Sequence, residues 1–141
     1  MKLNLGSGSD IKPKDEWINL DKRQWGGVDI VRDITRGLPF ADNTFEYIYA
    51  NNCLEHIKQG EDIFFVISEC YRVLKQGGTL FINVPHSESP QAFFPDHLSY
   101  WNEAMLMALL NDPYQSYGTY KFEVVEMTHI GYELKITLKK I

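Results

Sequence analysis

The chain has 141 residues, of which 44% are hydrophobic and 23% charged, and its formal net charge is −5 with neutral histidines. This composition excludes a mainly disordered chain and the length suits one domain, so we expect residues 1–141 to form a single domain with an apolar core. No run of Lys or Arg forms a basic stripe and no apolar stretch approaches the roughly 18 residues of a membrane span, so neither nucleic acid nor a membrane is an expected partner.

Seven strands are predicted along the chain, each a short apolar run between polar turns. They cover residues 2–5, 17–20, 28–32, 45–50, 79–84, 121–128 and 132–139. A helix is predicted over residues 61–75, where apolar residues recur at helical spacing, acidic residues fill the first turn and Gly77 is placed as the left-handed C-cap. A second helix is predicted to begin after Asn102 as N-cap, to carry residues 104–110 and to end at Asp112, which precedes a proline.

The order of these elements predicts an α/β fold with a mostly parallel seven-stranded sheet and a C-terminal antiparallel hairpin, which turns at residues 129–131. The connections between the first strands are short or broken by glycine and proline, which disfavours crossover helices. Leu3 and Leu5 also alternate with Lys2 and Asn4, whereas strands buried on both faces are usually continuously apolar. We therefore expect reduced helices on one face of the sheet, which is either solvated or covered by a second copy in a homodimer.

Glycine or polar residues follow each of the five central strands, where ligands bind in open α/β sheets. These residues are Gly6-Ser7-Gly8, Asp21, Asp33-Ile34, Asn51-Asn52 and Pro85-His86-Ser87. The glycines can adopt positive φ angles and let a ligand approach the backbone. An aspartate at a strand end can accept hydrogen bonds from a ribose diol or an exocyclic amine, although each of these residues also suits an ordinary turn or cap.

Five segments in chain order resemble the motifs of class I (Rossmann-like) methyltransferases that use S-adenosylmethionine (SAM), and the chain is similar to a short member of the type 11 group. The segments are residues 3–8 (LNLGSG), 19–21 (NLD), 38–46 (LPFADNTFE), 51–57 (NNCLEHI) and 71–80 (YRVLKQGGTL). The resemblance implies the class I methyltransferase fold and SAM as the cofactor. Beyond residue 85 it extends to the architecture alone.

The same resemblance implies roles for individual residues. The glycine-rich loop would pass beneath the methionine and ribose of SAM, Asp21 would hold the ribose hydroxyls, Asp33 and Ile34 would line the adenine, and Asn51 would lie near the methionine end. The expected cofactor-binding set is Asn4, Leu5, Gly6, Ser7, Gly8, Asp21, Asp33, Ile34 and Asn51. Asn4 stands where the family has an acidic residue.

Three histidines, His56, His86 and His97, are the candidate general bases, since histidine titrates near neutrality and a base helps where the methyl acceptor must lose a proton. His129 is expected at the hairpin turn, away from the carboxyl edge of the sheet, with no role. No metal motif is present, because the spacing of the two cysteines matches none. Two distant thiols without a signal peptide are typical of a reduced, cytoplasmic protein.

Methyl transfer from SAM to a small-molecule acceptor is the function that the sequence favours. The alternative is a SAM-fold binding or scaffold protein with weak or no catalysis, which the short chain and the missing helices favour. A third reading is a different nucleotide-binding α/β protein. A dinucleotide fingerprint that starts at Gly6 would need a third glycine where Ile11 stands, which argues against that reading.

Overall fold

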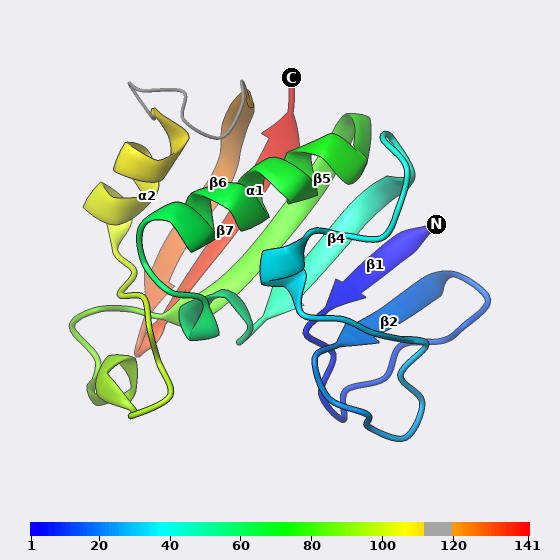
Figure 1. Cartoon of the computed structure of the whole chain (residues 1–141). Coiled ribbons are helices and arrows are strands. Elements are labelled where there is room, and N and C mark those ends of the chain that lie inside the picture. Colours follow the sequence, from blue (N-terminus) through cyan, green and yellow to red (C-terminus); the bar gives the residue numbers. More distant parts are fainter. Residues whose placement is uncertain (112–119) are drawn as a thin grey trace.

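The computed structural model describes residues 1–111 and 120–141 as a seven-stranded sheet with the strand order β3-β2-β1-β4-β5-β7-β6 (Figure 1). The strands from β3 to β5 run parallel, whereas β7 is antiparallel to both β5 and β6, as the sequence predicts. The strand bounds are β1 Lys2–Leu5, β2 Trp17–Asp21, β3 Ile30–Val31, β4 Phe45–Asn51, β5 Leu74–Pro85, β6 Phe122–Ile130 and β7 Glu133–Lys140.

Two α-helices and three short 3₁₀ turns connect these strands. The helices are α1 (Glu61–Val73) and α2 (Glu103–Leu110), and the 3₁₀ turns are η1 (Ile34–Arg36), η2 (Leu54–His56) and η3 (Pro90–Phe93). The predicted N-cap of α2 is confirmed, because the Asn102 side chain accepts a hydrogen bond of 2.8 Å from the Met105 N–H. The predicted end of this helix at Asp112 lies outside the described residues.

The predicted C-cap of the first helix is wrong. Helix α1 ends at Val73, and Leu74 is already extended and pairs with Phe45 as the first residue of β5. Gly77 does have a positive φ of 78°, but it lies inside β5, in the segment where the register between β4 and β5 shifts. Its backbone freedom therefore serves a bulge in the strand and not the end of the helix.

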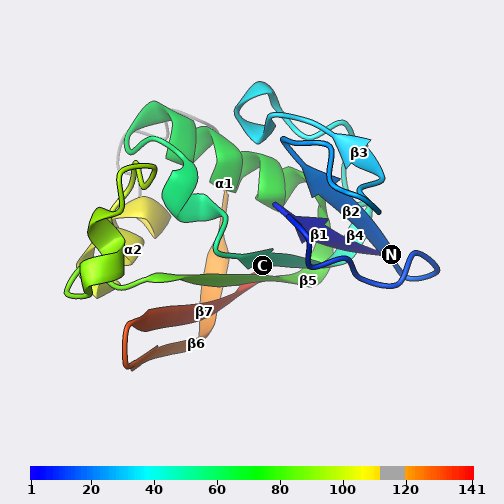
Figure 2. The same cartoon turned by 90° about the horizontal axis from the view of Figure 1, so that it is seen from below.

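Both α-helices lie on the same face of the sheet (Figure 2), and their apolar residues belong to one core. Helix α1 buries Ile63, Val66, Ile67, Cys70 and Val73, the residues of its predicted apolar face. The strands contribute every second residue to this core, among them Leu3, Leu5, Leu20, Ile48, Ala50, Leu80, Ile82, Leu134, Ile136 and Leu138. None of the helices in the described part of the chain has the length and apolar character to cross a membrane.

The opposite face of the sheet carries a row of half-buried aromatic side chains from the middle strands. Trp17 lies edge-on to Tyr47, and Tyr49 stacks on Phe81 with 5.3 Å between the ring centroids. The connections after β1 and β2 form no helix there, as their length predicts. A homodimer across this face stays a prediction, and light scattering that finds a strict monomer at high protein concentration would contradict it.

Both cysteines are free, buried thiols: Cys70 lies on the buried face of α1, and Cys53 follows the end of β4. Burial raises the pKa of Cys70 to about 12 and that of Cys53 above its ordinary range. Because the thiolate is the reactive form, we expect neither thiol to react with a disulfide reagent at pH 8 in the folded chain, and both to react at once in denaturant. Rapid reaction of either thiol without denaturant would contradict the buried placement.

Candidate functional site

The glycine loop after β1 is tied to the end of β2. Gly6 and Gly8 have φ angles of 68° and 52°, in the left-handed region that favours glycine. The Ser7 N–H donates to the Leu20 carbonyl over 3.0 Å, and the Gly8 N–H donates to Asp21 Oδ2 over 2.8 Å. The other Asp21 oxygen accepts from the Arg23 N–H over 2.8 Å. The carboxylate thus braces the loop, while its half-buried side chain keeps unused lone pairs.

The two glycines serve different purposes. A Cβ atom on Gly6 would lie 2.5 Å from the Cys53 Sγ, so glycine is needed there for the close approach of the loop to the segment after β4. A Cβ atom on Gly8 would meet nothing within 4 Å, so the backbone beside Gly8 faces open space. Gly8 is therefore the point of the loop that a ligand can approach closely.

This difference predicts a gap in stability between two matched variants. Gly8→Ala should cost about 1–2 kcal/mol, because alanine is strained at positive φ. Gly6→Ala should cost about 1–3 kcal/mol more, since its Cβ must also displace Cys53. Equilibrium denaturation of both variants measures the gap, and equal losses would contradict the packing of Gly6 on Cys53.

The remaining residues of the expected cofactor set are more enclosed. Leu5 is fully buried and Ile34 is 7% exposed within the apolar core. Asn4 is buried too, and its amide nitrogen donates to the Asp10 carbonyl over 2.7 Å and to Asn19 Oδ1 over 2.9 Å. These side chains hold the strand ends and the loop in place around Gly8 and Asp21.

Asp33 and Asn51 lie at the ends of their strands with one oxygen of each engaged. Asp33 Oδ1 accepts from both the N–H and the hydroxyl of Thr35, and these hydrogen bonds lower the pKa of the carboxyl. Asn51 Oδ1 accepts from the Asn83 amide over 2.8 Å, across the β4–β5 pair. Asp33 thus caps η1, and Asn51 is fixed beside the start of the neighbouring pocket.

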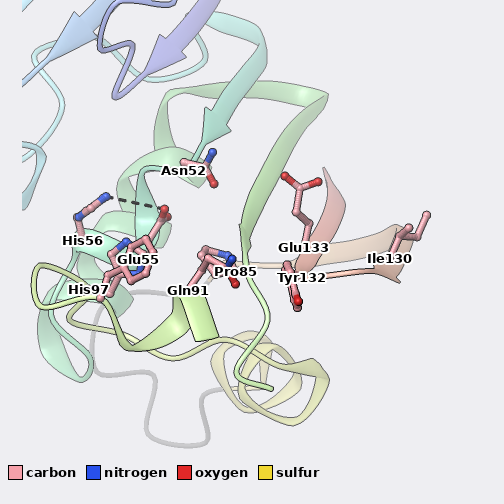
Figure 3. Close-up of a pocket in the computed structure, with 10 residues that line it drawn as sticks. Asn52, Glu55, His56, Pro85, Gln91, His97, Ile130, Tyr132 and Glu133 are labelled. Atoms are coloured by element: carbon pink, nitrogen blue, oxygen red, sulfur yellow. Dashed lines mark ion pairs between the residues drawn. The ribbon is translucent and has the colours of Figure 1, made fainter. Parts of the chain in front are cut away.

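A pocket of about 560 Å³ opens beyond the ends of β4 and β5 (Figure 3). Asn52, which lines it, has a φ of 51°, an uncommon conformation for a residue with a side chain and one that tends to occur at functional sites. The lining residues come from four separate segments and are Asn52, Glu55, His56, Pro85, Gln91, Phe94, His97, Ile130, Tyr132 and Glu133.

The β6–β7 turn forms one wall of this pocket, contrary to the expectation that it lies away from the carboxyl edge. Because β7 is antiparallel to β5, Glu133 pairs with Pro85, and the Tyr132 carbonyl accepts from the His86 N–H over 2.9 Å. The turn consists of Gly131 and Tyr132, whereas the sequence predicts the connection at residues 129–131. The sequence signals a hairpin here, but only the strand register brings its turn to the site.

His86 and His129 form a closed group beside the pocket. Their rings stack with 3.6 Å between centroids, which corrects the expectation that His129 is remote. His86 Nδ1 accepts from the Glu88 N–H over 3.1 Å, so the proton is on Nε2, which donates to Glu103 Oε2 over 3.0 Å. Both ring nitrogens of His86 are thus engaged, and the side chain is only 4% exposed. This arrangement favours a structural role for His86.

The other two candidate histidines lie together in the pocket with the carboxylate of Glu55, which follows the fourth strand in the sequence and for which no role was expected. His56 and His97 meet edge to face at 4.8 Å, and His56 Nε2 lies 3.8 Å from Glu55 Oε1 (Figure 3). Glu55 is 2% exposed, and burial raises the pKa of its carboxyl to about 7. The adjacent Glu55-His56 pair was the available signal, but His97 is 41 residues further along the chain.

The aromatic loop before α2 divides between core and surface. Trp101 is fully buried, whereas Phe93, Phe94 and Tyr100 are 66%, 51% and 44% exposed. Phe94 lines the pocket beside His97, with 5.4 Å between the ring centroids. The loop thus anchors through Trp101 and presents Phe94 to the pocket.

The sheet order and the closing antiparallel hairpin define the class I methyltransferase fold, in which an acidic strand end here braces a glycine loop. The family model described as "Methyltransferase domain" matches residues 8–82, which is more than half of the chain, and the chain belongs to this family. Probable tRNA methyltransferase 9B of Mus musculus is 36% identical over 83 residues, which cover 57% of this chain and 19% of the mouse protein. The chain thus spans about a fifth of the length of that curated relative.

Solved structures of methyltransferases share the whole fold at low sequence identity. A SAM-dependent methyltransferase from Aquifex aeolicus is 16% identical with a TM-score of 0.71, and the match covers 99% of this chain and 81% of that one. The Burkholderia thailandensis 1,6-didemethyltoxoflavin-N1-methyltransferase, solved with bound 1,6-didemethyltoxoflavin and S-adenosylhomocysteine, is 18% identical with a TM-score of 0.69, and the match covers 99% of this chain and 70% of that one.

Proposed function

We propose that this chain is a SAM-dependent methyltransferase that acts on a small-molecule acceptor. The 2.8 Å hydrogen bond from the Gly8 N–H to Asp21 Oδ2 carries the proposal, because it joins the glycine loop and the acidic strand end into one cradle. Support also comes from the open space beside Gly8. Because glycine has no side chain, a ligand can lie directly against the backbone at this position. Two free, buried thiols fit a reducing compartment such as the cytoplasm.

The residues of the cradle fit SAM. The half-buried Asp21 carboxylate has lone pairs left for two ribose hydroxyls, and Asp33 keeps one oxygen for the adenine side. Bound SAM would supply a methyl group on a positively charged sulfur. SAM has no pyrophosphate and therefore does not need a helix N-terminus to bind one. In agreement with this, the loop after Gly8 forms no helix.

The acceptor is proposed to bind in the pocket beyond Asn52. Its volume of about 560 Å³ lies within the range of small-molecule sites, which supports a small acceptor over a macromolecular one. The contact between Gly6 and Cys53 places the glycine loop against the segment that leads to Glu55, so the cradle and the pocket adjoin. Methyl transfer breaks the carbon–sulfur bond, forms a bond to the acceptor and leaves S-adenosylhomocysteine.

An acceptor that loses a proton in this displacement needs either a base that receives the proton or a group that lowers the pKa of the acceptor. Glu55, His56 and His97 line the pocket and are the titratable cluster nearest to the end of β4. Phe94, which lies beside His97, and Tyr132 add flat apolar surface to the lining. We propose that this cluster acts on the acceptor, while the cradle holds the cofactor.

Release of S-adenosylhomocysteine from SAM in the presence of a panel of small hydroxyl, amine and thiol acceptors tests the function. Turnover with at least one acceptor is the expected result, and at a SAM concentration below saturation it should fall roughly ten- to hundredfold in an Asp21→Ala variant. SAM binding without turnover on any acceptor would instead favour the alternative of a binding or scaffold protein. The helix-free face of the sheet and the Asn4 amide nitrogen, whose two hydrogen bonds stay within the chain, support that alternative.

A further inference from the structure

The three pocket residues Glu55, His56 and His97 present their ligand atoms to one another. One ligand atom from each lies within 4.8 Å of the others, and Figure 3 shows the three side chains gathered on one side of the pocket. In a tetrahedral site with ligand bonds of roughly 2.0–2.2 Å, two ligand atoms lie about 3.3–3.6 Å apart. An ion would therefore draw the ligand atoms of this cluster together by up to about 1.2 Å.

The cluster contains buried acceptor atoms that have no partner. Glu55 is 2% exposed, and its Oε2 atom is buried and makes no hydrogen bond with any described residue. The same is true of His97 Nδ1 and, in the same pocket, of Gln91 Oε1. A buried polar atom without a partner is costly. A cation held by Glu55, His56 and His97 would give the Glu55 carboxylate and the His97 imidazole a partner.

The surrounding backbone orients the ligands before any ion arrives. His56 Nδ1 lies 3.0 Å from the Asp96 carbonyl, which can only accept, so Nδ1 carries the proton and Nε2 offers its lone pair toward Glu55. Metal-binding histidines are typically held in this way by a carbonyl or a carboxylate. The Glu55 carbonyl in turn accepts from the N–H groups of Leu98 and Ser99, which fixes the His97 loop against η2.

We propose that Glu55, His56 and His97 bind one divalent transition-metal ion of the Zn²⁺ type at the acceptor side of the pocket. Two imidazoles and a carboxylate favour such an ion over Mg²⁺, which prefers oxygen ligands, and three protein ligands leave a position open toward the pocket. The catalytic part of this inference rests on the proposed function: an acceptor oxygen or nitrogen in the open position would release its proton to solvent more readily. The cluster then acts through the ion rather than as a base.

A second cluster of similar composition provides the control. His86, Glu103 and His129 also lie within 4.8 Å of one another, but their hydrogen bonds and ring stacking already occupy the buried atoms of His86. None of their buried side-chain atoms lacks a partner among residues 1–111 and 120–141. Loss of His129, which is exposed, should leave the binding of an ion at the pocket unchanged.

Calorimetric titration of the chelator-treated full chain with Zn²⁺, and with Mg²⁺ for comparison, tests the site. We expect one equivalent of Zn²⁺ to bind and Mg²⁺ to bind far more weakly. His56→Ala, which removes a side chain that is 40% exposed, and Glu55→Gln should each weaken Zn²⁺ binding at least about tenfold, while His129→Ala should match the parent chain.

Thermal unfolding confirms that each variant is folded. No stoichiometric Zn²⁺ binding, unchanged binding in His56→Ala, or loss of binding in His129→Ala would each overturn the site. Because the readout is metal binding alone, its failure is separable from that of the proposed function: a chain that binds Zn²⁺ but not SAM keeps the metal site and loses the methyltransferase, and the reverse holds too.

Discussion

Replacement of Asp21 by alanine is expected to weaken SAM binding roughly ten- to hundredfold, since hydrogen bonds to a charged group contribute about 1.5–3 kcal/mol. The loss has two sources. The ribose hydroxyls would lose their acceptor, and the Gly8 N–H would lose the carboxylate that holds it at 2.8 Å. Calorimetric titration of the folded variant with SAM measures the change.

Asp29→Ala is the matched control for this prediction. Asp29 also braces a strand through its carboxylate, which accepts from the Asn19 N–H over 2.8 Å, but it lies in the connection before β3 and outside the cradle. We expect its SAM affinity to stay within about twofold of the parent chain, because no cradle contact is removed. Equal affinities in the Asp21 and Asp29 variants would remove the ribose assignment.

Replacement of Trp101 by alanine is expected to lower the free energy of unfolding by about 3–5 kcal/mol, the usual cost of removing a large buried aromatic side chain. Trp101 is fully buried, and its indole N–H donates to Ser99 Oγ over 2.9 Å. That hydroxyl donates onward to the Leu54 carbonyl over 3.0 Å. The side chain therefore fastens the loop that carries His97 to η2, which carries Glu55.

Tyr100→Ala tests the same loop without the core contact. Tyr100 is 44% exposed, so its loss should cost less than about 1 kcal/mol. Urea denaturation of both variants gives the comparison. A loss below about 1 kcal/mol for Trp101→Ala would mean that the loop is held by other contacts than the buried indole.

The elements of this fold could largely be predicted, because they follow from local periodicity. The first strand has the predicted bounds, and helix α1 begins at Glu61 as its acidic first turn indicates. Its end could not be predicted locally, because Leu74 leaves the helix to pair with Phe45, 29 residues earlier in the chain. The partner strand β4 determines where the helix ends and β5 begins. A pattern of neighbouring residues holds no information about that distant strand.

The candidate site divides in the same way. Gly8 and Asp21 follow consecutive parallel strands, so the rule that ligands bind at carboxyl ends was enough to bring them together. The pocket was not predictable by that rule, since Glu133 reaches it only through the antiparallel register of β7 with β5. His97 joins Glu55 through backbone hydrogen bonds between a loop and η2, for which the sequence has no periodic signal.

Calorimetric titration of the purified chain with SAM, with S-adenosylhomocysteine and with NAD as the control tests the central claim most directly. We expect SAM and S-adenosylhomocysteine to bind at one site per chain and NAD not to bind. Binding of NAD in preference to SAM, or of neither SAM nor its product, would contradict the assignment of the cradle at Gly8 and Asp21.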